Sequence, residues 1–126
     1  MPTRRQARLN EQLKREISEI IHREIDDPRI GPVTVTGVRV TSDLSFARVF
    51  VRTLSDPGAQ DQAVEGLEGA AAFIRRALGS RLRLRHVPEL RFEEDRTLEQ
   101  ARRIEEILDD VRPVDGWDAD GDESSS

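Results

Sequence analysis

The spacing of the apolar residues changes from a helical to a strand period within the first half of the chain, and this change constrains the fold most. From about Arg4 to Ile25, apolar residues recur every three or four positions, which is typical of a helix with one buried face. Over Val33–Val40 and Phe46–Leu54 they alternate, which is typical of strands. The first alternation changes phase at Gly37, and this predicts a β-bulge. A helix followed by a β-hairpin is therefore expected.

The second half of the chain predicts a broken helix, a third strand and a last helix. Helical spacing runs from Val64 to Leu78, but Gly66 and Gly69 lie inside it and each costs about 1 kcal/mol relative to alanine. We therefore expect two helices that meet at a kink, followed by a strand over Glu89–Glu94 and an amphipathic helix. This order of elements predicts an α+β domain in which helices pack on one face of a three-stranded sheet. The predicted kink residues are Ala70, Ala71 and Ala72.

Charge divides the chain of 126 residues into a basic part and an acidic end. The overall net charge is -5, yet residues 105–126 alone carry -8, so the preceding residues carry +3. We expect residues 1–112 to form one domain and residues 113–126 to be a disordered acidic tail. The chain has no cysteine and no long apolar run, which predicts a cytoplasmic protein without disulfides or a membrane span.

Six arginines crowd into the segment 75–91 against the single acid Glu89. Such a local excess of positive charge is typical of a surface that binds a nucleic acid backbone. On a helical wheel Arg75, Arg76 and Arg83 face away from the predicted core, whereas Arg81 and Arg85 point toward it unless the helix ends near Leu82. Together with the arginines at the start of the chain, the predicted RNA-binding residues are Arg4, Arg5, Arg8, Arg75, Arg76, Arg81, Arg83 and Arg85.

Residues that could support catalysis are few. His22 and His86 lack the neighbours of a catalytic or metal-binding motif. The acidic run Glu93, Glu94 and Asp95 alternates along a strand, so its carboxylates are not expected to converge on one ion. We therefore expect no enzyme, no metal and no cofactor.

Four segments of the chain resemble the ribosome-binding factor A family: REIDDPRIG (23–31), TVTGVRVTSDLSFARVFV (34–51), AAFIRRALGSRLRLRHVPELRF (71–92) and DRTLEQARRIEEIL (95–108). The resemblance implies a type II KH-like fold with a kinked helix junction in place of a GxxG loop. Ala72 stands where the family pattern has glycine. The chain does contain GxxG at Gly66–Gly69, but Glu68 within it would repel phosphate, so we interpret that match as coincidence.

The same resemblance implies a function in ribosome assembly. It implies binding to the immature small (30S) ribosomal subunit and to 16S rRNA, support of late 16S rRNA processing, a link to assembly GTPases and to growth in the cold, and no catalysis. We expect a monomer.

Two alternatives remain open from the residues alone. The chain could be a protein interaction module that docks another protein on an exposed sheet face around Phe46, Phe50 and Leu54. A nuclease that holds Mg²⁺ on Glu93 and Asp95 is a further, weaker reading. The acidic end is also a candidate competitor for the basic surface.

Overall fold

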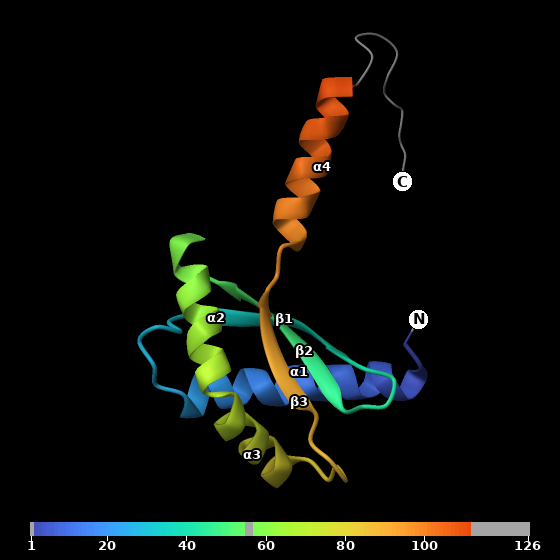
Figure 1. Ribbon diagram of the computed structural model, residues 1–126, viewed down its shortest axis with the longest axis vertical. Helices are drawn as coiled ribbons and strands as arrows, with labels where there is room; N and C mark the ends of the chain where they lie inside the picture. Colours follow the sequence, from blue (N-terminus) through green and yellow to red (C-terminus); the bar gives the residue numbers. More distant parts are fainter. Residues whose placement is uncertain (1, 55–56, 112–126) are drawn as a thin grey trace. The chain divides into compact units, whose positions relative to one another are not determined.

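The computed structural model describes residues 2–54 and 57–111 (Figure 1). The chain forms two compact units, Met1–Asp95 and a second that begins at Arg96. The elements of the first unit are α1 (Arg4–Glu24), β1 (Val33–Val40), β2 (Phe46–Thr53), the 3₁₀ turn η1 (Pro57–Ala59), α2 (Gln60–Gly69), α3 (Ala71–Arg81) and β3 (Glu89–Glu94). The second unit contains α4 (Thr97–Val111). The predicted tail 113–126 lies outside the described residues, so the domain boundary at residue 112 stays a prediction.

The strands form one mixed sheet in the order β1-β2-β3. β1 pairs antiparallel with β2, and β3 pairs parallel with β2. The pairing of β1 shifts register between Val35 and Gly37, which confirms the predicted bulge. The crossover from β2 to β3 runs through α2 and α3, as a parallel pair requires.

The core lies between the sheet and the helices of the first unit. Alternate strand residues, among them Val49 and Val51, are buried against apolar side chains of α1, α2 and α3 such as Ile17, Leu67 and Ile74. These are the positions that the sequence periodicity predicts. In Figure 1, α1 runs behind the strands, so the other face of the sheet is turned toward the viewer. The expected α+β architecture, with helices on one face of a three-stranded sheet, is confirmed.

Side chains of the helices close both outer edges of the sheet. At the β1 edge, Asn10 Oδ1 accepts a hydrogen bond from the Val40 amide at 2.9 Å, and the His22 ring Nε2 donates to the Val33 carbonyl at 3.0 Å. At the β3 edge, the Glu68 carboxylate accepts from the Phe92 amide. These contacts satisfy some of the backbone groups that an open edge would offer to another chain.

The long helical segment breaks at Ala70. Its amide donates to the carbonyls of Gly66 and Leu67 at 3.1 and 3.0 Å and so ends α2, while its carbonyl accepts the first hydrogen bond of α3 from Ile74 at 3.0 Å. Ala70 has φ -95° and ψ 1°, outside the helical range of ψ. The predicted kink is confirmed, and the break falls at the first of its three predicted residues.

The second unit contributes an amphipathic helix. Ile104, Ile107 and Leu108 of α4 are exposed. Among the described residues, no helix combines the length and the apolar character needed to span a membrane.

Candidate nucleic-acid interface

The arginines of the segment 75–91 fall into distinct structural roles, and Arg75 serves the fold. Its Nε donates to the Pro88 carbonyl at 3.1 Å and its Nη2 to the Val87 carbonyl at 3.0 Å. The side chain is half-buried and ties α3 to the residues that lead into β3. Two of its donors are therefore engaged inside the protein, although the helical wheel places Arg75 near the solvent side.

Arg81, the last residue of α3, binds α1 through three ion pairs. Its guanidinium lies 2.6 Å from Glu19, 2.7 Å from Glu24 and 3.2 Å from Glu16. The hydrogen bond from Arg81, with a smaller contribution from Arg23, lowers the pKa of the Glu19 carboxyl below its ordinary value. The helical wheel places Arg81 on the side that faces the core, and in the structure its guanidinium meets the acids of α1 on that side. One cation thus contacts three carboxylates and offsets one unit of the negative charge that repels phosphate from this side of the molecule.

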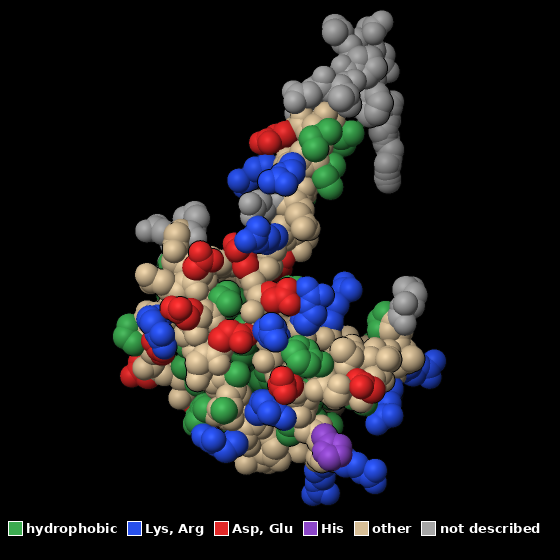
Figure 2. All heavy atoms as spheres, viewed as in Figure 1, with side chains coloured by type: hydrophobic (Ala, Val, Ile, Leu, Met, Phe, Trp, Pro, Cys, Tyr) green, Lys and Arg blue, Asp and Glu red, His purple; other side chains and the backbone are tan. Residues whose placement is uncertain are grey.

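The remaining cations of the cluster are exposed. Helix α3 ends at Arg81 and Leu82 is extended, with φ -115° and ψ 145°, so Arg83 and Arg85 lie on the segment between α3 and β3. The condition under which Arg85 can point outward is therefore met. Arg76, Arg83 and Arg85 form no ion pair with any residue that the structure describes. Figure 2 shows Lys and Arg side chains gathered over α3 and the segment that follows it.

The predicted residues of the N-terminus lie in the first turns of α1. Arg4, Arg5 and Arg8 are exposed, and the first turn contains no acid. Thr3 and Gln6 form a capping box that satisfies the first amides of the helix. Positive side chains at this end of a helix oppose the helix dipole and cost stability. Their presence there is more easily explained by a negatively charged partner than by folding.

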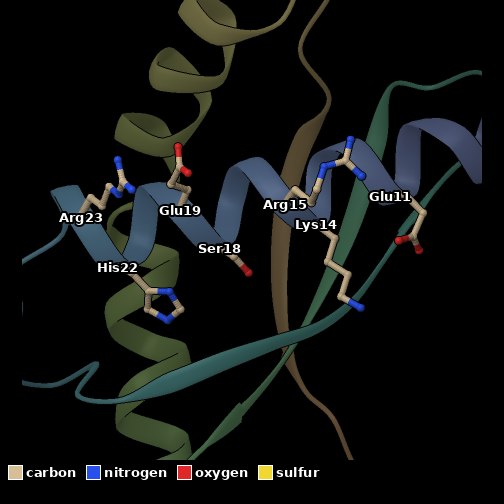
Figure 3. A pocket seen from close by; sticks show the side chains of 7 residues that line it. All are labelled: Glu11, Lys14, Arg15, Ser18, Glu19, His22 and Arg23. Atoms are coloured by element: carbon tan, nitrogen blue, oxygen red, sulfur yellow. The ribbon is translucent and has the colours of Figure 1, made fainter.

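An open surface groove of about 580 Å³ follows the exposed side of α1 (Figure 3). In the view of Figure 3, Lys14 and His22 point toward β1, whereas Arg15 and Arg23 point to the opposite side of the helix. The acids that line the groove are Glu11 and Glu19, and Glu19 is paired with Arg81. The groove carries an excess of positive charge, because three cations line it against two acids, and Arg81 pairs with one of those acids.

Lys14, Arg15 and Arg23 are not among the residues predicted from the sequence; Arg15 shares the solvent face of the helix with Arg4 and Arg8, where Glu11 and Glu19 dilute the positive charge. Arg81 pairs with Glu19 and with two further acids of α1 and so offsets one unit of their negative charge, and no local sequence pattern predicts this pairing.

The acidic residues considered for metal binding form ion pairs within the fold, and the GxxG match lies outside a loop. Glu93 pairs with Arg48, and Asp95 pairs with Arg52. Among the described residues, no three His, Asp or Glu side chains are placed to hold a metal ion. The GxxG tetrapeptide lies within α2 rather than in a loop, and its Glu68 binds the β3 backbone.

Helices on one face of a mixed three-stranded sheet, a broken helix before the last strand and a basic surface beyond that break define a KH-like α+β domain. The family model of ribosome-binding factor A matches residues 5–108. The chain therefore belongs to the ribosome-binding factor A family.

Relatives and solved structures agree with this assignment. The chain is 44% identical over 115 residues to ribosome-binding factor A of Staphylococcus carnosus, covering 91% of this chain and 100% of the relative. It is 47% identical over 112 residues to that of Thermomicrobium roseum, covering 89% and 87%. The crystal structure of ribosome-binding factor A from Thermus thermophilus is similar with a TM-score of 0.67 at 34% identity, covering 73% of this chain and 97% of that one.

A homology model of the Thermus thermophilus protein, fitted into a cryo-electron microscopy map of its complex with the 30S subunit, is similar with a TM-score of 0.57. The match has 34% identity and covers 68% of this chain and 90% of that one.

Proposed function

We propose that this protein is an assembly factor of the small ribosomal subunit, which binds the immature 30S particle through 16S rRNA and supports late 16S rRNA processing without catalysing a reaction. Membership of the ribosome-binding factor A family supports the ribosome as partner. The observation that carries the RNA contact is the set of exposed arginines without described ion pairs, Arg76, Arg83 and Arg85, beside a helix in which three of the four acids pair with Arg81.

The proposed interface has three parts. Arg76, Arg83 and Arg85 contact phosphates from the side of α3, while the exposed side of α1 contributes a second basic strip. Arg75 and Arg81 hold α3, β3 and α1 in the arrangement that presents these cations. The arginines at the start of the chain extend the strip, which consists of Arg4, Arg5, Arg8, Lys14, Arg15 and Arg23.

The junction at Ala70 places α3 at an angle to α2, as Figure 1 shows. Ala70, Ala71 and Ala72 carry no polar side chain, and Ala72 is exposed, so the RNA backbone can approach this junction closely. A cytoplasmic location, a monomeric state, release by an assembly GTPase and a requirement for growth in the cold belong to the same proposal.

Co-sedimentation with ribosomal particles tests the proposed function. The full-length protein is centrifuged with immature small subunits, mature small subunits and large subunits over a series of salt concentrations. We expect recovery with immature small subunits that falls as salt rises, because phosphate contacts release counterions. The double variant Arg83→Gln/Arg85→Gln should be recovered less, and the double variant Arg102→Gln/Arg103→Gln, which loses equal charge from α4, should behave as the unmodified protein. Equal recovery with every particle would contradict the proposal.

A further inference from the structure

A row of three arginines crosses the open face of the sheet. Arg39 on β1 lies directly opposite Arg48 on β2, and Arg48 lies opposite Arg91 on β3. All three side chains are exposed. Since neighbouring strands lie about 4.8 Å apart, the three residues start within a span of roughly 10 Å. The row is separate from the cations of α1 and α3, because it lies on the face that these helices leave uncovered.

This row is unfavourable for folding by itself. Like charges directly opposite each other on neighbouring strands destabilise a sheet. Glu93 forms a two-pronged pair with the middle residue, Arg48, at 2.6 and 2.7 Å. Arg39 and Arg91 form no ion pair with a residue in the described part of the chain. The guanidinium of Arg48, held by Glu93, therefore lies between Arg39 and Arg91, which have no ion pair in the described part of the chain.

Two phenylalanines complete the surface. The Arg48 guanidinium carbon lies over the Phe50 ring, 5.1 Å from its centre, and that of Arg91 lies over the Phe46 ring at 5.7 Å. Both rings are half-buried and are on the same strand as Arg48. RNA-binding proteins use aromatic rings and guanidinium planes as platforms for unstacked bases. The open face thus has two such platforms beside arginines that can bind phosphate.

We propose that the open face of the sheet is a second RNA-binding surface, specific for single-stranded nucleotides. Arg39 and Arg91 bind the phosphates, while bases stack on the two guanidinium–ring pairs, Arg48 over Phe50 and Arg91 over Phe46. The inference rests on the proposed function in assuming an RNA partner, but it assigns a different surface and a different form of RNA. Guanidinium forks in a row match a chain of phosphates better than they match an apolar protein surface.

Fluorescence anisotropy with labelled RNA tests this surface in the full-length protein. The probes are a single strand of about ten nucleotides, a length within the range of small single-strand sites, and a duplex of the same length. Phe46→Leu/Phe50→Leu should weaken binding of the single strand roughly tenfold and leave duplex binding unchanged, because only unpaired bases can stack on the rings. Arg39→Gln/Arg91→Gln should weaken single-strand binding by a similar factor, and it does not disturb the core. Thermal unfolding of each variant verifies that it is folded.

The control Arg102→Gln/Arg103→Gln, in α4, removes the same charge and should leave single-strand affinity within about twofold of the unmodified protein. Unchanged single-strand binding in the Arg39/Arg91 variant would overturn the inference. It would also be overturned if the sheet variants lowered recovery with small subunits but not oligonucleotide binding, because the face would then dock a protein. If the sheet variants lost oligonucleotide binding while the unmodified protein bound no ribosomal particle, this surface would be supported and the proposed function rejected.

Discussion

The salt dependence of RNA binding is the most direct quantitative consequence of the proposed interface. The perturbation is Arg83→Gln/Arg85→Gln, which removes two exposed cations from the segment between α3 and β3. Neither side chain forms an ion pair with a described residue, so their removal breaks no described ion pair. The variant should therefore keep the stability of the unmodified protein and change only its affinity for RNA.

The expected magnitude follows from the number of available cations. Six side chains are exposed and without a described ion pair at the two sites predicted from the sequence: Arg4, Arg5, Arg8, Arg76, Arg83 and Arg85. They set the lower limit, because Arg15 and Arg23 of the basic strip on α1 are exposed as well. If each contacts one phosphate of duplex RNA, the logarithm of the affinity falls with the logarithm of salt with a slope of about -5. Affinity should then drop roughly 10³-fold between 50 and 200 mM salt, and the double variant should have a slope shallower by about two units.

The assay is filter binding of a duplex fragment of rRNA at four or more salt concentrations, for the unmodified protein, the double variant and the control Arg102→Gln/Arg103→Gln. The control has the same net charge as the variant, so it separates local phosphate contacts from the general attraction of a cation for RNA. An equal change of slope in both would refute the assignment of the contacts to Arg83 and Arg85. An unchanged slope in both would refute any role of these residues in binding.

The structure also yields predictions about stability. Gly66→Ala should lower the free energy of unfolding in urea by about 1 kcal/mol, because the added Cβ would lie 2.9 Å from Ile30 Cγ1 and overpacking outweighs the gain in helix propensity. Gly79→Ala, whose Cβ meets only an ordinary contact, should raise it by about 0.5–1 kcal/mol; the opposite order of the two variants would contradict the packing of α2. Arg75→Ala should cost about 1–3 kcal/mol in the same measurement, since two backbone carbonyls lose their donors, and a neutral result would show that water replaces the side chain. Hydrogen bonds from two hydroxyls and an amide lower the pKa of Asp43 from 3.8 to about 2, so its stabilisation is complete above pH 3.8 and is lost as pH falls through 2; the stability difference from Asp43→Asn should shrink over that interval, and a constant difference would count against the assigned hydrogen bonds.

The fold could be predicted from the sequence because local patterns agree with the tertiary structure. Apolar periodicity identified the buried faces of α1, β2 and β3, and the phase change at Gly37 identified the bulge. The glycines of α2 suggested a break, yet Gly66 itself serves a close approach to Ile30, and the chain turns at Ala70. The sequence predicts that the helix is interrupted, whereas packing against the segment before β1 determines where.

The candidate site could be predicted only in part, because the sequence shows where arginines occur and not what they contact. Arg75 and Arg76 are neighbours with similar surroundings in the sequence, but Arg75 binds two carbonyls while Arg76 is exposed without a described ion pair. The cross-strand row of Arg39, Arg48 and Arg91 depends on the register of three strands. A one-residue slip would turn these side chains to the buried face, so the row cannot be inferred before the register is known.

The pairing of Arg81 with α1 shows how an acidic chain can present a basic surface. Removing Arg81 would subtract one cation and also leave Glu16, Glu19 and Glu24 without their partner, and Glu19 lines the groove of α1. Because the released carboxylates repel phosphate, Arg81→Gln should weaken RNA binding more than the loss of one exposed arginine such as Arg83, although Arg81 itself need not touch RNA. By formal charge alone, replacing Arg81 or Arg83 should weaken RNA binding equally. The ion pairs of Arg81 predict a larger loss of affinity for Arg81. A paired arginine can contribute to an interface by removing competing acids from it.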